Sequence, residues 1–154
     1  MAKNLCRGRH LTGLPLYNQA GEMLGRVREL AVDEEGKLRA LAISDDKWFT
    51  WEQIVACTDE GIKIAGEALA SCPVPCPAWL EQTLLDQQKQ EIGQVGDLIL
   101  DKTTGTVQGI ELAQTIFDDL WQGRREIPWQ QLTWENGYLV WLESEKAGQT
   151  MNET

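Results

Sequence analysis

Four cysteines and a single histidine are the side chains of this chain best suited to bind a metal ion or take part in redox chemistry. Cys72 and Cys76 form the only close pair, and their Cys-x-x-x-Cys spacing differs from the Cys-x-x-Cys pattern of zinc and redox sites. A zinc ion would need two more ligands, and Cys6 and Cys57 are the only thiols left. His10 has no cysteine or carboxylate at a ligand spacing. We therefore expect Cys72 and Cys76 to be free thiols with a structural role, and we predict no metal site.

Acidic side chains are the second group that could carry chemistry, because they recur at matching places in the chain. Glu29 and Asp33 are matched by Asp97 and Asp101. Paired carboxylates can act as acid and base or bind calcium, but these lie at strand ends and turns without a dense cluster of oxygen ligands. The sequence also contains no glycine-rich phosphate loop, Ser-His-Asp set or Gly-x-Ser-x-Gly elbow. We predict no catalytic residue, no cofactor and no enzymatic activity.

An internal repeat organises the elements that would position any site. Residues 24–33 read as a β-strand entered through a glycine and left through an acidic turn, and residues 92–101 repeat this pattern 68 positions later. In both copies a glycine turn, a second apolar strand, a Trp-x-x-Ile/Leu crossing and a glycine-led strand follow. The positions expected to shape the two copies are Gly25, Val27, Gly36 and Trp51, matched by Gly93, Val95, Gly105 and Trp129. We expect both tryptophans to fill the core of their copy.

The repeat predicts a mainly β fold with two tandem small antiparallel β-barrels joined by a linker helix. The first barrel is placed in residues 1–70, a Cys/Pro segment and the linker helix in 71–90, the second barrel in 91–143 and a disordered tail in 144–154. The helix is expected over residues 78–89, which are rich in helix formers, and Leu80 and Leu84 lie one helical turn apart.

One strand of the first copy has no clear counterpart in the second. The short strand expected over residues 13–17 has its match where the Cys/Pro segment and the linker helix are predicted. Either the region of Pro73 and Val74 closes the second barrel, or the first copy lends it a strand.

The second copy is longer than the first by nine residues between its second strand and its tryptophan. The additional residues fall in 114–126, where we expect a long protruding hairpin. In one interpretation an acidic pair faces a basic pair across the turn, and Trp121 packs on the linker helix through Leu80 or Leu84. In the other, the tip is exposed and docks a partner or a second subunit. The candidate docking residues are Leu120, Trp121, Arg124 and Arg125.

Together these features resemble the PRC-barrel family. The resemblance covers residues 13–64 and 91–141. The family includes the cytoplasmic domain of the H subunit of purple-bacterial photosynthetic reaction centres, the C-terminal domain of a ribosome-maturation factor and short sporulation-related proteins of Firmicutes. The resemblance implies a non-enzymatic protein-binding or scaffold module. Two alternatives are a ribosome-maturation or RNA-processing accessory protein and a peripheral accessory of an electron-transfer complex.

The composition narrows the choice of partner and compartment. The chain has 154 residues and a net charge of −10, which disfavours direct nucleic-acid binding because that needs lysine and arginine to displace counterions. No apolar run approaches the ~20 residues of a transmembrane helix, and the first residues lack a signal peptide's apolar core, so we expect a cytoplasmic protein. Open strand edges and seven tryptophans predict a protein partner and a homodimer. Four of the tryptophans could line a docking surface: Trp48, Trp121, Trp134 and Trp141.

Overall fold

The computed structural model describes residues 4–113 and 126–142. The chain divides into two compact units. Unit 1 comprises the chain up to Pro77 together with Ile99–Val107, and unit 2 comprises Ala78–Leu98 and the described residues from Gln108 onward. The predicted mainly β class is confirmed. The described strands form open sheets, and no closed barrel is found among them.

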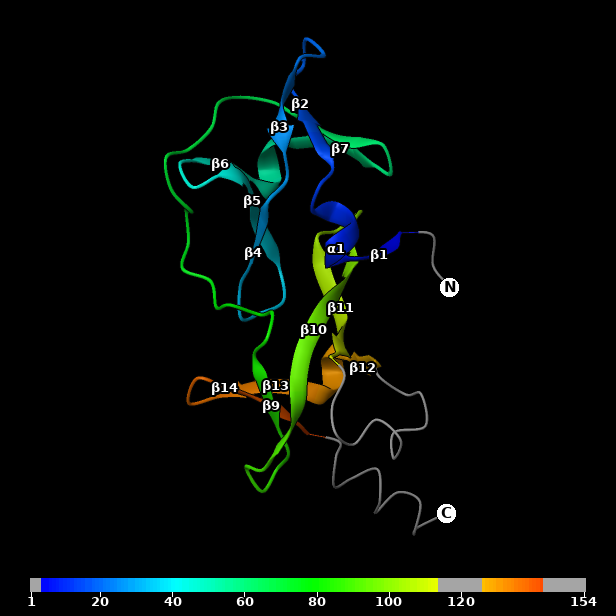
Figure 1. The fold of residues 1–154 in the computed structure, drawn as a ribbon, viewed down its shortest axis with the longest axis vertical. Helices are drawn as coiled ribbons and strands as arrows, with labels where there is room; N and C mark the ends of the chain where they lie inside the picture. Colours follow the sequence, from blue (N-terminus) through cyan, green and yellow to red (C-terminus); the bar gives the residue numbers. More distant parts are fainter. Residues whose placement is uncertain (1–3, 114–125, 143–154) are drawn as a thin grey trace. The chain divides into compact units, whose positions relative to one another are not determined.

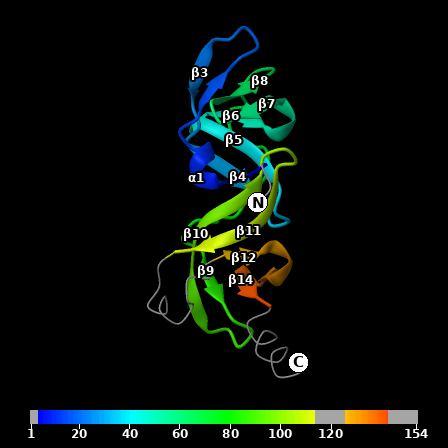
Figure 2. The ribbon, with the colours of Figure 1, turned by 90° about the vertical axis from the view of Figure 1, so that its right-hand side faces the viewer.

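Unit 1 contains a four-stranded sheet and a three-stranded sheet. The four-stranded sheet has the order β3-β2-β8-β7, with β2 (Pro15–Tyr17), β3 (Met23–Arg26), β7 (Ile54–Thr58) and β8 (Gly61–Ile64). The three-stranded sheet has the order β4-β5-β6, with β4 (Glu29–Val32), β5 (Leu38–Ser44) and β6 (Lys47–Thr50). Figure 2 shows these strands in one view. Leu16 and Ile62 from the first sheet and Leu41 from the second are almost fully buried, so both sheets contribute to the core.

The second repeat supplies part of unit 1. Strands β10 (Glu91–Asp101) and β11 (Thr106–Leu112) are neighbours, and the turn between them belongs to unit 1 (Figure 1). Strand β1 (Leu5–Arg7), which precedes the one-turn helix α1 (Gly8–Leu11), pairs with the end of β10. The backbone N–H of Leu38 donates to the carbonyl of Gly105 at 2.7 Å, and that of Val107 donates to Gly36 at 2.6 Å. The two glycine turns matched by the repeat are therefore joined by two reciprocal hydrogen bonds.

Unit 2 is built around a sheet with the order β12-β11-β10-β9-β14-β13. The remaining strands are β9 (Thr83–Leu85), β12 (Glu126–Pro128), β13 (Leu132–Glu135) and β14 (Tyr138–Trp141). Among the described residues, 3₁₀ turns are formed by η1 (Trp51–Gln53) in unit 1 and η2 (Trp129–Gln131) in unit 2. Trp79, Leu84 and Leu139 are buried in unit 2.

The turn before β3 recurs in unit 2 with the same hydrogen bonds. The side-chain oxygen of Asn18 accepts from the backbone N–H groups two and four residues further on, at 3.0 and 2.9 Å. Asp86, 68 positions later, does the same at 2.8 and 2.9 Å. Both turns contain a left-handed residue, Gly21 at φ 87° and Lys89 at φ 69°. Asparagine and aspartate both stabilise this local turn through a side-chain oxygen, which explains why either can begin it.

The predicted linker helix over residues 78–89 is wrong. This segment contains strand β9 and turns, with no helix. Leu84 is fully buried because β9 pairs with both β14 and β10. Leu80, which the helix would have placed beside Leu84, is 58% exposed. Burial of a strand between two partners outweighs helix propensities of a few tenths of a kcal/mol per residue.

Strand β9 is also the segment that pairs with the last strand of the second copy. In unit 1, β2 runs parallel to β8 with Leu16 beside Ile62. In unit 2, β9 runs parallel to β14 with Leu84 beside Leu139. Strand β9 and not the Pro73–Val74 region takes this place, so the first alternative is wrong, whereas strand β1 of the first copy does pair with the end of β10.

Candidate functional site

The four-stranded sheet of unit 1 has one buried face and one exposed face. Leu16 and Ile62 are neighbours in the sheet and point to the buried face. The next residue along each strand points the opposite way, because side chains alternate along a β-strand. We call this second face the outer face. It is made by Pro15, Tyr17, Met23, Arg26, Ala56 and Lys63, of which four form one cross-strand row in the order Met23, Tyr17, Lys63, Ala56.

Tyr17 is the aromatic centre of the outer face, and Gly61 allows its position. A Cβ atom on Gly61 would lie 2.9 Å from Cε2 of Tyr17 and 3.1 Å from the carbonyl oxygen of Pro15. Real Cβ atoms do not approach other atoms that closely, so the ring of Tyr17 lies against strand β8 only because residue 61 lacks a side chain. The ring is half-buried, as an aromatic residue available for a protein contact would be.

The charges on this sheet have one sign. The four strands contain two charged residues, Arg26 and Lys63, and both are exposed cations. Arg26 lies opposite Pro15 and donates from Nη1 to the carbonyl oxygen of Gly13 at 2.9 Å. The outer face therefore combines an aromatic ring, the exposed side chain of Met23 and two cations, in a chain whose net charge is −10.

A β-bulge at each terminal strand adds an exposed apolar side chain. Leu24 is the extra residue in β3 and is 37% exposed, and Val55 is the extra residue in β7 and is 55% exposed. A bulge turns its residue away from the regular alternation and bends the edge of the sheet. Bulged edges pair poorly with a further strand, so this sheet is better suited to contacts through side chains than to strand addition.

The matching positions in unit 2 carry different residues. Tyr17 corresponds to Leu85, Met23 to Glu91 and Lys63 to Val140, as the register of the matching strands shows. Val140 is fully buried, whereas Lys63 is exposed. The matching strand pairing thus forms in unit 2 without an aromatic residue or a cation at these positions.

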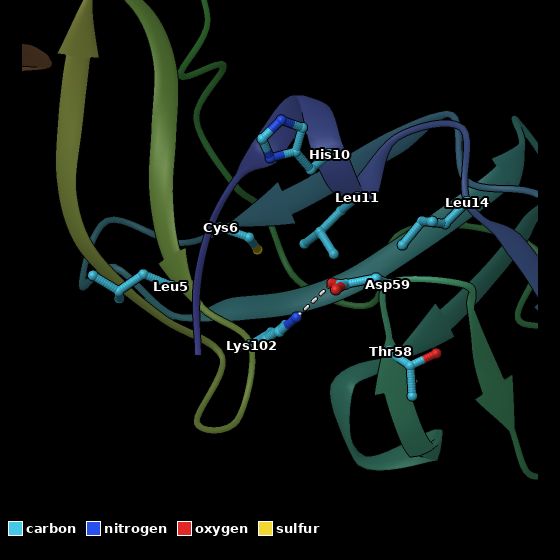
Figure 3. A pocket seen from close by; sticks show the side chains of 8 residues that line it. All are labelled: Leu5, Cys6, His10, Leu11, Leu14, Thr58, Asp59 and Lys102. Carbon is cyan, nitrogen blue, oxygen red and sulfur yellow. Dashed lines mark hydrogen bonds and ion pairs between the residues drawn. The ribbon is translucent and has the colours of Figure 1, made fainter. Parts of the chain in front are cut away.

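A cavity of about 460 Å³ is the second feature of unit 1 (Figure 3). It is lined by Leu5, Cys6, His10, Leu11, Leu14, Thr58, Asp59 and Lys102. His10 lies on helix α1. Nζ of Lys102 donates to Oδ1 of Asp59 at 2.7 Å, and the Lys102 side chain is 19% exposed while that of Asp59 is 93% exposed. The cavity thus offers one ammonium group that is already paired.

The Lys102–Asp59 pair changes the protonation of both partners. The hydrogen bond from Lys102, together with its charge, lowers the pKa of Asp59. The same hydrogen bond raises the pKa of Lys102. Burial raises the pKa of the nearby Cys57 thiol, and the charge of Lys102 partly opposes this. Among the described residues, no group of three or more histidine, cysteine or acidic side chains could hold a metal ion.

Replacing Lys102 with methionine is expected to raise the pKa of Asp59 toward its ordinary value. Because the folded-state pKa of Asp59 is lowered, its contribution to stability is present above the unfolded pKa and is lost as pH falls through the folded pKa. NMR titration of the Asp59 carboxyl carbon measures the shift. Lys63→Met is the control, since it removes a cation from the outer face and should leave the Asp59 titration unchanged. An unaltered Asp59 pKa in Lys102→Met would show that the pair does not form in solution.

The site residues proposed from the sequence have separate locations. The docking candidates Leu120, Trp121, Arg124 and Arg125, with the predicted hairpin, lie outside the described residues, as does the tail over 144–154. Of the repeated positions, Val27 and Val95 are buried. The remaining repeated residues lie in β3 (Gly25), in β10 (Gly93), in the glycine turns (Gly36 and Gly105) and in the two half-buried 3₁₀ turns (Trp51 and Trp129).

Sequence reasoning did not find the outer face. Tyr17 and Met23 come from the consecutive strands β2 and β3, whereas Lys63 comes from β8 and lies beside Tyr17 only through the parallel pairing of β2 with β8. The one local signal was that the charged residues of these strands are both cations, Arg26 and Lys63. This signal can be seen only after the strands themselves are known.

The comparison with known protein families supports the resemblance seen in the sequence. The family model described as the PRC-barrel domain matches residues 4–66, which span β1 to β8. No curated protein matches the chain significantly. No helix in the described parts of the chain is both long and apolar enough to cross a membrane.

Proposed function

We propose that this protein is a non-enzymatic binding or scaffold module that docks an acidic segment of a protein partner on the outer face of unit 1. The observation that carries the proposal is the cross-strand row of Met23, Tyr17 and Lys63, which places an apolar chain, an aromatic ring and a cation side by side on an exposed sheet. Aromatic residues are enriched among the side chains that dominate binding energy at protein interfaces. The match to the PRC-barrel domain covers this sheet.

Charge complementarity selects the chemistry of the partner. Arg26 and Lys63 attract carboxylates, whereas the acidic remainder of the chain repels them. An acidic partner segment would therefore approach in one orientation, with its apolar residues against Tyr17 and Met23. Such an arrangement gives specificity and a faster association rate more than it gives raw affinity.

The second unit extends this proposal as a second PRC-barrel-like copy, over about residues 79–142. The turn hydrogen bonds of Asn18 recur at Asp86, and the parallel pairing of β2 with β8 recurs between β9 and β14. The two copies diverge at the outer-face positions. The first copy would then present the docking face, and the second copy would share its scaffold without that face.

The two alternative roles differ from the main proposal in the identity of the partner. In a ribosome-maturation or RNA-processing role, the net charge of −10 favours contact with a protein of the particle over contact with RNA. In an electron-transfer role the partner would be a subunit of a membrane complex. Both alternatives would use the same outer face and are distinguished by which partner is recovered.

Reversing the charge of Lys63 is expected to weaken partner binding by about tenfold or more, the effect of an interface residue worth above 1 kcal/mol. The wild-type chain is used to capture partners from the native cell, and the captured partner is then titrated against Lys63→Glu and Tyr17→Ala. Lys47→Glu is the matched control, because it reverses another exposed cation of unit 1, on strand β6.

The comparison of the two charge reversals decides the docking face. Lys47→Glu should bind as the wild type does, and rising salt should weaken wild-type binding more than Lys63→Glu binding. Equal affinities for Lys63→Glu, Tyr17→Ala and the wild type would contradict docking on the outer face. Turnover of a small-molecule substrate by the purified chain would contradict the non-enzymatic part of the proposal.

A further inference from the structure

Two thiols lie over a face of the three-stranded sheet that is lined with small side chains. Cys72 and Cys76 pack against the buried cluster of Ala31, Ala40, Ala42 and Trp48. Alanines at these positions leave room for a chain segment to approach the sheet closely. The segment is fixed on its N-terminal side at Leu69, which exchanges two backbone hydrogen bonds with Trp48, at 2.9 and 2.7 Å.

The backbone of this segment directs both cysteines toward the sheet. Along residues 71–76 exposure alternates, with Cys72, Val74 and Cys76 partly buried and Pro73 and Pro75 exposed. The chain bends at Pro73 and Val74, between the two cysteines. Proline fixes φ and restricts the residue before it, so this bent stretch has little freedom to rearrange. The two thiols are therefore presented on the same side at a nearly fixed separation.

The thiols are hydrogen-bonded to each other. The Cys72 thiol donates to the carbonyl oxygen of Val74 at 3.1 Å. Burial raises the pKa of Cys76 to about 11, and the neighbouring Cys72 adds to this through its charge and a side-chain hydrogen bond. A hydrogen bond that raises the pKa of Cys76 is one in which its S–H is the donor, since the neutral form is then favoured. The hydrogen bonds thus run from the Cys76 thiol to the Cys72 sulfur, and from the Cys72 thiol to the carbonyl oxygen of Val74.

We propose that Cys72 and Cys76 form a two-coordinate site for one copper(I) ion. Soft thiolate ligands select copper(I) over harder divalent ions. As a d¹⁰ cation, copper(I) is satisfied by two thiolates in a linear arrangement. The described residues offer no third or fourth ligand nearby, which zinc would require. The alanine face covers the two thiols on one side, and copper(I) with two thiolates needs no water ligand.

Binding is an exchange of protons for the metal ion. Two S–H bonds break, two Cu–S bonds form, two protons go to solvent, and no electron is transferred. The product carries one negative charge. The guanidinium of Arg39, which pairs with Asp33 at 3.1 Å, lies near enough for its charge to favour the thiolate of Cys76, while Asp33 opposes it. Arg39 therefore partly balances the charge of the bound complex.

Proton release gives the site a distinct pH dependence. Each thiol that loses its proton contributes about tenfold in affinity per pH unit, so the release of two protons makes affinity rise about 100-fold per unit below the thiol pKa values. A carboxylate or backbone site would show almost no such dependence near neutral pH. The slope thus counts the thiols that bind the ion.

The test is a titration of the full reduced chain with copper(I) under anaerobic conditions, in competition with the chromogenic chelator bicinchoninate. We expect one ion per chain, about a 100-fold rise in affinity per pH unit and two sulfur neighbours in copper X-ray absorption. Cys72→Ser and Cys76→Ser should each lower affinity by more than the about 10–100-fold that loss of an outer-shell partner costs a metal site. The matched control is the double variant Cys6→Ser/Cys57→Ser, which removes the other two thiols and should bind copper(I) unchanged.

Three results would overturn the proposal. The first is equal loss of binding in the double control variant. The second is one ion per two chains with formation of a dimer, which would place the ion between molecules. The third is that the reduced protein does not bind copper(I) tightly, although glutathione disulfide oxidises Cys72 and Cys76 to a disulfide with a mass loss of two hydrogens. Circular dichroism of each serine variant confirms that it is folded, so a loss of affinity reports on the site.

Discussion

Replacing Trp79 with alanine is expected to lower the free energy of unfolding by about 3–5 kcal/mol, the effect of truncating a buried aromatic side chain. Trp79 is 4% exposed. Its ring centroid lies 5.7 Å from that of Trp129 and 5.0 Å from that of Trp134, with an edge-on arrangement to Trp134 at 75°. Such aromatic pairs add to the hydrophobic term. Trp79 lies in one segment of unit 2 and the other two rings lie in another, η2 with β13, so the substitution removes a contact that holds the two segments together.

Leu80→Ala is the control for Trp79→Ala, and urea unfolding followed by circular dichroism measures both. Leu80 is the next residue and is 58% exposed, so its truncation should change stability by no more than about 0.5 kcal/mol. The contrast between two adjacent residues tests the non-helical backbone of this segment, which buries Trp79 and exposes Leu80. Similar losses for the two variants would contradict it and would favour the amphipathic helix that local propensity indicates.

Replacing Gly105 with alanine is expected to destabilise unit 1 by about 2–4 kcal/mol. Gly105 has φ +72°, a left-handed conformation that costs an L-residue about 1–2 kcal/mol. A Cβ atom there would also lie 2.8 Å from Cε2 and 2.9 Å from Cζ2 of Trp51, and overpacking of this kind costs about 1–3 kcal/mol. The carbonyl of Gly105 accepts the hydrogen bond from Leu38, so a displaced turn would also weaken the junction of the two glycine turns.

Gly21→Ala separates the two contributions at Gly105. Gly21 has φ +87°, and a Cβ atom there would meet nothing within 4 Å. Its replacement should cost about 1 kcal/mol from the backbone alone. Trp51→Ala in the Gly105→Ala background should recover part of the loss, which a double-mutant cycle of unfolding free energies measures. Equal losses for Gly105→Ala and Gly21→Ala would show that the contact with Trp51 is absent.

The sequence by itself determined the features that arise from local chemistry. Left-handed backbone conformations favour glycine, so the spacing of Gly36 and Gly105 indicated where both turns lie. Alternating and β-branched apolar runs indicated strands, although residues 24–33, expected as one strand, form the two strands β3 and β4. The resemblance to the PRC-barrel family was also readable, because its motif is a set of turn and strand residues, and the family match supports it over residues 4–66.

The tertiary structure alone decided the features that depend on partners distant in sequence. Residues 78–89 have helical propensity, but Leu84 gains full burial as a strand between β14 and β10, and no local pattern carries that gain. Assignment of the β10–β11 turn to unit 1 likewise depends on hydrogen bonds between residues about 70 positions apart. The outer face and the thiol pair arise in the same way. Tyr17 meets Lys63 through a parallel strand pair, and Cys72 and Cys76 become a site through the alanine face beneath them.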